Sequence, residues 1–86
     1  MGVTTSPKIS RVKPQADKLL LVDFANGEKR LYDCKPLLLH EEFRLLSDDA
    51  FFKCAKADPH GYGVVWSDEV DLAESEIWLN GERVKD

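Results

Sequence analysis

The sequence lacks any apolar run long enough to cross a membrane. No stretch approaches the roughly 20 apolar residues that a spanning helix needs, and no leader with a basic start and an apolar middle opens the chain. The sequence therefore gives no indication of membrane insertion or export. We expect a cytoplasmic protein with no membrane partner.

The chain is also poor in residues that bind metals or form disulfides. Its two cysteines are Cys34 and Cys54, and its two histidines are His40 and His60. The cysteines form no CxxC pair, which favours free, partly buried thiols over a disulfide or redox pair. The histidines show none of the short spacings with His or Cys that metal sites use. We expect no metal and no cofactor.

An excess of positive charge is missing too. The chain has 12 basic and 16 acidic residues, with a net charge of −4. Such a chain repels phosphate backbones unless its basic residues gather on one face, and no basic run is interleaved with aromatic residues. We therefore expect no nucleic-acid binding by this chain alone.

Motifs of nucleophilic catalysis are absent as well. None of the serines stands in a GxSxG context. A pair formed by Cys54 and His60 would need both side chains on one face and a third group to orient the base. We expect no enzyme and assign no catalytic residue. The alternative is a small-molecule-binding or enzymatic domain, for which Cys54, His60 and Asp71 are the least poor candidates.

What the chain does have is the composition of one small globular domain. It has 86 residues, of which 43% are apolar and 33% are charged. This length suits one compact domain with a limited core. We expect residues 1–6 to be a disordered tail, residues 7–80 to form the domain and residues 81–86 to be a C-terminal tail.

The clearest local signal is Asn26-Gly27 between two extended patterns, residues 18–25 and 28–33. This dipeptide predicts a β-hairpin with a type I′ turn, which needs positive φ at both central residues. On the first strand, Leu20, Val22 and Phe24 share one face. Residues 8–13 precede the hairpin and are typical of an edge strand flanked by prolines.

The middle of the chain predicts a short helix and a second hairpin. Residues 38–46 are helix-like, and Ser47 or Asp48 is a cap candidate for the next turn. Residues 52–57 and 62–66 are typical of strands joined by a turn at residues 58–61. The predicted fold class is α+β: a small antiparallel sheet from two β-hairpins, with one or two short helices packed on it.

The end of the chain allows two interpretations. Residues 68–79 are compatible with a helix that groups Leu72, Glu76 and Leu79 and ends at Asn80-Gly81. Alternatively, Asn80-Gly81 turns a third hairpin between residues 76–79 and 82–85. We favour the helix.

Charged and aromatic residues supply the candidate interaction surface. Residues 68–76 hold an acidic cluster, which is either a solvated face or a docking patch for a basic partner. An exposed Trp beside carboxylates would be a hot spot for protein binding. Glu28 and Arg30 point to one face of their strand, either as a cross-strand ion pair with Asp23 or Lys18 or as a recognition edge. The candidate surface comprises Glu28, Arg30, Trp66, Asp68, Asp71 and Trp78.

A characteristic order of residues runs along most of the chain: Leu20, Phe24, Asn26-Gly27-Glu28, Arg30, Asp33, Pro36-Leu37-Leu38, Phe43, Leu46, Phe51-Phe52, Gly61, Val65-Trp66, Asp71-Leu72, Glu74 and Ile77. Over about residues 8–79 this order resembles a small bacterial family known as domain of unknown function 2442. One departure is Ser67-Asp-Glu-Val70, where the family more often carries a glycine-containing turn.

This resemblance implies a compact α+β domain without assigned catalytic residues. Some members look fused to a helix-turn-helix domain, and others are encoded beside another very small protein. That context favours a regulatory or antitoxin-like protein-interaction module. We expect its partner to be another small protein of basic charge, and the chain itself to be a monomer or a weak homodimer.

Overall fold

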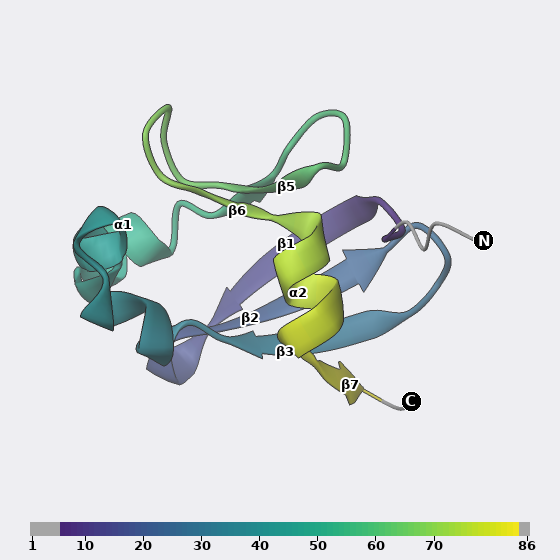
Figure 1. Cartoon of the computed structure of the whole chain (residues 1–86), viewed down its shortest axis with the longest axis horizontal. Helices are drawn as coiled ribbons and strands as arrows, with labels where there is room; N and C mark the ends of the chain where they lie inside the picture. Colours follow the sequence, from purple (N-terminus) through teal and green to yellow (C-terminus); the bar gives the residue numbers. More distant parts are fainter. Residues whose placement is uncertain (1–5, 85–86) are drawn as a thin grey trace.

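The computed structural model describes residues 6–84, which form two antiparallel sheets and several short helices (Figure 1). The predicted disordered tail therefore lies, up to residue 5, outside the described residues. The elements in chain order are β1 (Ile9–Gln15), η1 (Ala16–Lys18), β2 (Leu19–Phe24), β3 (Lys29–Asp33), η2 (Lys35–Leu39), η3 (Glu41–Ser47), α1 (Asp49–Phe52), β4 (Lys56–Ala57), β5 (Gly63–Val65), β6 (Asp71–Ala73), α2 (Glu74–Asn80) and β7 (Glu82–Val84), where η marks 3-10 helices.

The first sheet has four strands in the order β1-β2-β3-β7, and the second has three in the order β4-β5-β6. Helix α2 crosses one face of the larger sheet, and the smaller sheet lies beyond one end of α2 (Figure 1). The α+β prediction is confirmed. The strands nevertheless form two sheets rather than one, because the chain leaves the first sheet after β3 and passes through η2, η3 and α1 before extending again.

The central hairpin of β2 and β3 is confirmed, and so is the buried face of β2. Leu20, Val22 and Phe24 are all buried. The predicted type I′ turn is wrong, because the Phe24 amide donates to the Glu28 carbonyl oxygen at 2.8 Å and closes a loop of three residues, 25–27, in which only Gly27 has a positive φ, of 91°. The Asn26 side chain instead accepts a hydrogen bond from the Glu28 amide at 3.0 Å. A three-residue loop with glycine in the left-handed position is the next most common hairpin connection.

A second tight connection joins β1 to β2, and the sequence did not indicate it. Asp17 and Lys18 both adopt φ of 62°, and Gln15 pairs with Leu19 directly across this turn. Two consecutive left-handed residues between paired strands are what the twist of a tight hairpin demands. Here two non-glycine residues adopt the geometry that was predicted for Asn26-Gly27.

The second predicted hairpin is only partly correct. The expected strand over residues 52–57 is reduced to β4, because Phe52 instead ends α1. That helix begins where the Asp48 side chain accepts a hydrogen bond from the Ala50 amide at 2.9 Å, which confirms Asp48 as a cap. The turn at residues 58–61 is confirmed, with Asp58 accepting from the His60 amide at 2.9 Å.

The end of the chain combines the helix with a strand. Helix α2 confirms the favoured interpretation, although Leu72 lies in β6 ahead of it. Glu82–Val84 then form β7 and pair with β3, so the prediction of a tail over residues 81–86 is wrong for these residues. A Cβ at Gly81 would lie 2.6 Å from the Ile77 carbonyl oxygen and 3.1 Å from Arg30 Cβ. Glycine thus lets the chain turn from the helix onto the sheet edge.

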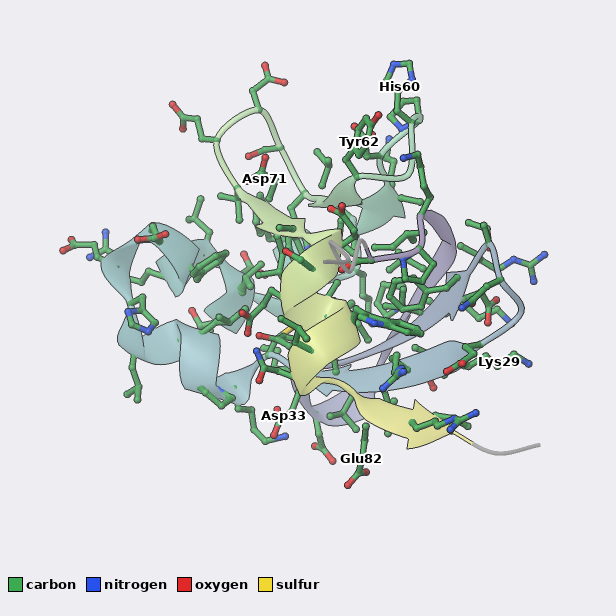
Figure 2. All side chains as sticks on the ribbon, turned by 45° about the vertical axis from the view of Figure 1, so that its right-hand side comes forward. Lys29, Asp33, His60, Tyr62, Asp71 and Glu82 are labelled. Carbon is green, nitrogen blue, oxygen red and sulfur yellow. The ribbon has the colours of Figure 1, made fainter. Side chains whose placement is uncertain are left out.

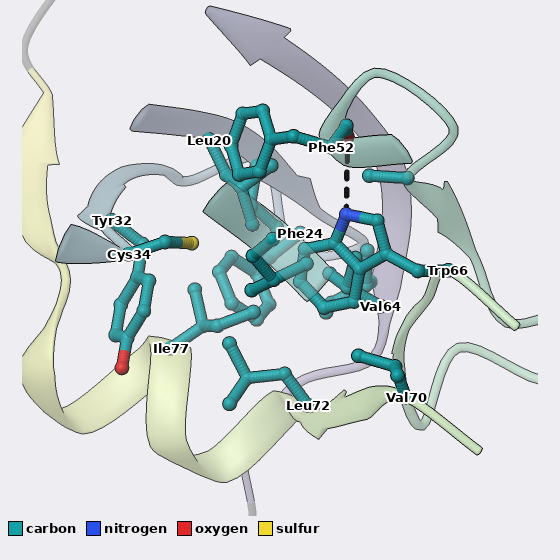
Figure 3. Close-up of a cluster of buried hydrophobic side chains, with 14 residues drawn as sticks. Leu20, Phe24, Tyr32, Cys34, Phe52, Val64, Trp66, Val70, Leu72 and Ile77 are labelled. Atoms are coloured by element: carbon teal, nitrogen blue, oxygen red, sulfur yellow. Dashed lines mark hydrogen bonds between the residues drawn. The ribbon is translucent and has the colours of Figure 1, made fainter. Parts of the chain in front are cut away.

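One apolar core joins the two sheets and α2 (Figure 3). Trp66 lies in it and donates its indole N–H to the Phe52 carbonyl oxygen at 3.0 Å. None of the helices in residues 6–84 has the length and apolar character that a membrane span requires. The buried residues are Ile9, Leu20, Val22, Phe24, Tyr32, Cys34, Leu46, Phe52, Ala55, Val64, Trp66, Val70, Leu72 and Ile77.

The backbone at Gly27 gives a direct test of the turn. No atom lies within 4 Å of a Cβ built at Gly27, so a substitution there meets only the strain of positive φ. We expect Gly27→Ala to lower the free energy of unfolding by about 1–2 kcal/mol. Gly27→Asn should cost less, because Asn tolerates the left-handed region. Urea unfolding of both variants measures this, and equal losses would contradict the assigned turn.

Candidate functional site

Three of the predicted surface residues meet where α2 packs on the large sheet. The guanidinium carbon of Arg30 lies 4.0 Å from the ring centroid of Trp78. Glu28 Oε1 accepts from Arg30 Nη2 at 3.2 Å and also pairs with Arg83 Nε at 3.5 Å. We call these four residues the hairpin cluster. They link the end of the turn, β3, β7 and α2.

The hairpin cluster has a packing role. The Arg30 side chain is only 16% exposed, and its ion-pair partner is Glu28, the residue just before its strand, rather than Asp23 or Lys18. Lys18 instead forms an ion pair with Asp49. Trp78 also packs edge-on against Phe24 in the core, with 5.1 Å between ring centroids. Arg30 is therefore largely covered within its own chain.

The remaining predicted surface residues lie elsewhere. Trp66 is only 7% exposed, so the prediction that places it on an interaction surface is wrong for this residue. Its burial follows from its indole hydrogen bond to Phe52 and its place between the two sheets. Asp68 lies on the exposed loop between β5 and β6. Asp71, on β6, is the predicted residue that reaches a concave part of the surface.

Asp71 lines a cleft of about 480 Å³ between two parts of the chain. Its lining residues come from η2, η3 and the residue between them on one side, and from β6 and α2 on the other. His40 and Glu42 contribute to it, although no sequence pattern links them to Asp71. We call this the acidic cleft. It is lined by Leu37, His40, Glu42, Phe43, Asp71, Leu72, Ala73 and Glu76.

Negative charge dominates the acidic cleft. Its lining includes the carboxylates of Glu42, Asp71 and Glu76 and no Lys or Arg. Glu76 is held in place because Tyr32 donates its hydroxyl hydrogen to Glu76 Oε2 at 2.9 Å. Burial, and then this hydrogen bond, raise the pKa of Tyr32 above its ordinary value. Tyr32 therefore stays a neutral donor that fixes one carboxylate at the edge of the cleft.

Comparison with known protein families shows which family the chain belongs to. The model of the family described as protein of unknown function (DUF2442) matches residues 9–82. The chain belongs to the DUF2442 family. No curated protein and no solved structure matches the chain. The matched range contains every residue that lines the acidic cleft, so this cleft is part of the DUF2442 domain itself.

The thiols and histidines of the DUF2442 domain have separate surroundings. Cys34 and Cys54 are both free, as expected from their spacing. The Cys54 thiol donates to the Ala50 carbonyl oxygen at 3.4 Å, whereas the His60 ring lies beside Tyr62 at the tip of another loop. Figure 2 shows His60 on the turn before β5 and Asp71 at the start of β6, on different segments. Within residues 6–84, no group of three His, Cys, Asp or Glu side chains has metal-binding geometry.

Cys34 is chemically quiet because it is buried. Its side chain is fully covered, and burial, followed by the nearby charge of Asp33, raises its pKa to about 12. A thiol with such a pKa is almost entirely protonated at neutral pH and is a poor nucleophile. Cys54 lies on the surface. The two thiols are thus distinguishable by their reactivity.

The hairpin cluster predicts unequal effects of two conservative changes. Arg30→Lys removes the planar group that stacks on Trp78, so we expect a loss of about 1 kcal/mol in unfolding free energy. Arg83→Lys changes an exposed ion pair and should stay within about 0.5 kcal/mol. Urea unfolding of both variants measures the difference. Equal losses would show that stacking on Trp78 adds nothing.

The buried thiol predicts a labelling pattern and a pH dependence. At pH 8 a disulfide reagent should modify one thiol in the native chain and two after unfolding, and Cys54→Ser should leave none reactive in the native chain. Since folding raises the pKa of Cys34 from 9.0 to about 12, the unfolded chain ionises first. Stability should therefore fall as pH rises above about 9. Fast labelling of both native thiols would contradict this burial.

Proposed function

We propose that this chain is a non-catalytic protein-interaction module of a regulatory, antitoxin-like kind. In this proposal the acidic cleft holds a basic segment of a small partner protein. The observation that carries the proposal is the lining of that cleft, which combines three carboxylates with apolar side chains and contains no Lys or Arg. Such a lining attracts Lys or Arg side chains and disfavours phosphate groups.

The apolar part of the lining supports a peptide rather than a small ion as the ligand. Leu37, Phe43 and Leu72 lie among the carboxylates. A segment that alternates basic and apolar side chains would satisfy both kinds of group. Charged pairs would then set orientation and association rate, while apolar burial would supply affinity.

The helical wall of the cleft also exposes apolar residues. Leu39 in η2 is 88% exposed and Leu45 in η3 is 55% exposed. Exposure of large apolar side chains to water is thermodynamically unfavourable, and groups of them commonly mark protein contacts. They would extend the contact with a partner beyond the cleft along η2 and η3.

The regulatory part of the proposal rests on the family resemblance. Some members of the family look encoded beside another very small protein, and a basic neighbour of that kind would complement this acidic chain. Asp68 and Glu69, on the loop that leads into β6, are exposed and would add to the attraction at longer range. Binding that covers a partner's basic residues is a simple way to restrain a partner that acts on nucleic acid.

The test compares two variants with the same change of charge. The product of the adjacent gene is co-purified with wild type, with Glu42→Gln/Asp71→Asn and with Asp17→Asn/Glu41→Gln. Asp17 is exposed in η1, and Glu41 pairs with Arg44 at the exposed surface, so the second variant is the control. We expect the cleft variant to weaken binding about tenfold or more and the control to change it about twofold at most.

Calorimetry at two salt concentrations completes this experiment. Wild-type affinity should fall as salt rises, and the cleft variant should show a smaller fall because fewer charge pairs form. Equal weakening by both variants would reduce the effect to net charge. No complex with the neighbouring protein, or binding that neither variant changes, would overturn the proposal.

A further inference from the structure

The large sheet has a second face, turned away from α2. Strand residues alternate between the two faces, so the neighbours of the buried residues point to this side. In Figure 2, Lys29, Asp33 and Glu82 lie on the lower side of the molecule, opposite the smaller sheet and its loops, where His60 and Asp71 are labelled. We call this the open face. It carries Arg11, Lys13, Gln15, Leu19, Leu21, Asp23, Lys29, Leu31, Asp33, Glu82 and Val84.

The open face has an apolar centre. Leu19, Leu21, Leu31 and Val84 are each only partly buried, and none belongs to the core cluster or packs against it. A solvated sheet face in an antiparallel fold ordinarily alternates to polar residues. Three leucines in the middle of such a face are therefore unusual, and they need a cover.

The strand register arranges charge around these leucines in a regular way. Across the sheet, one row runs Lys13, Leu21, Leu31, Glu82, and the next runs Arg11, Asp23, Lys29, Val84. A line drawn along the strands between β2 and β3 divides both rows. In the first row, the cation Lys13 and the anion Glu82 lie at equal distances on opposite sides of this line. In the second row, Asp23 and Lys29 lie on opposite sides of it in the same way.

We propose that a second copy of this chain covers the open face, related by a two-fold axis that runs along the strands between β2 and β3. Rotation about this axis places β1 over the partner's β7 and β2 over the partner's β3. Lys13 then meets the partner's Glu82, and Leu21 meets the partner's Leu31. Asp23 meets the partner's Lys29. Every one of these contacts occurs twice, as a closed two-fold interface requires.

The charge pattern selects this axis over the other simple one. A two-fold axis across the strands, through the first row, would place Lys13 on the partner's Lys13 and Glu82 on the partner's Glu82. Like charges facing each other disfavour that arrangement. Two sheets packed face to face keep their strands within about 30° of each other, so the central row is the one whose contacts are best aligned.

The size of the open face makes this a weak, reversible dimer. Four strands about 4.8 Å apart and three rows of side chains about 7 Å apart cover roughly 400 Å². A stable interface buries about 800 Å² on each partner. Two of the facing pairs contribute little binding energy across the axis, namely Arg11 with Val84 and Leu19 with Asp33. Asp33 already pairs with Lys35 of its own chain at 3.1 Å.

The dimer leaves the acidic cleft open. The cleft is formed by η2, η3, β6 and α2, whereas the open face lies on the opposite side of the sheet from α2. A dimer would present two clefts, but its formation does not depend on anything binding there. The proposal is thus independent of the function proposed above.

Charge reversal combined with mixing tests the axis. We measure association by sedimentation velocity from about 10 μM to 1 mM, a range suited to an interface of this size. Lys13→Glu alone and Glu82→Lys alone should each weaken self-association about tenfold, because each places like charges in both symmetric contacts. An equimolar mixture of the two variants should associate again, since every contact then joins opposite charges.

Two further variants complete the design. Leu31→Ser should abolish association by removing the apolar centre, with circular dichroism confirming that the variant is folded. Lys56→Glu, an equal reversal at an exposed position of β4 in the smaller sheet, should leave association within about twofold of wild type. A wild-type monomer at 1 mM, or a mixture that associates no better than its two components, would overturn the proposal.

Discussion

The packing of Trp78 against the large sheet is the contact on which the other features depend. Its indole lies between the Arg30 guanidinium and the Phe24 ring, so one side chain of α2 contacts both strands of the central hairpin. Helix α2 has seven residues, which is too short for stability in isolation. Tertiary packing must therefore hold it, and Trp78 together with the buried Ile77 supplies that packing.

This placement of α2 decides what lies on either side of it. Strand β6 leads directly into the helix, and β7 follows directly after it. Fixing the helix thus brings the second sheet over the core and brings β7 to the edge of the first sheet. It also aligns Glu76 with Tyr32, so the acidic cleft and the hairpin cluster share one structural cause. The two faces of the large sheet consequently differ in burial, because α2 covers one face and leaves the other exposed.

The local signals in the sequence performed well where they were strong. The central hairpin, the buried face of β2, the Asp48 cap and the turn at residues 58–61 all follow from neighbouring residues. They failed where a distant contact prevails. The strand pattern over residues 52–57 gave way to α1, and residues 82–84 joined β3 because Gly81 permits a close approach to Arg30. Trp66 was misplaced for the same reason, since its partner Phe52 is fourteen residues away.

By itself, the sequence determined the α+β class, the family and the acidic character of the chain, because composition, alternation and turn chemistry are local properties. It identified Asp71 as a candidate residue, but it could not associate that residue with His40 and Glu42, which lie about thirty positions earlier. Only the tertiary structure brought these groups into one cleft and paired Glu28 and Arg30 with Trp78 and Arg83. The physical reason is that side-chain neighbours across a fold depend on strand register and helix packing, which no short stretch of sequence encodes.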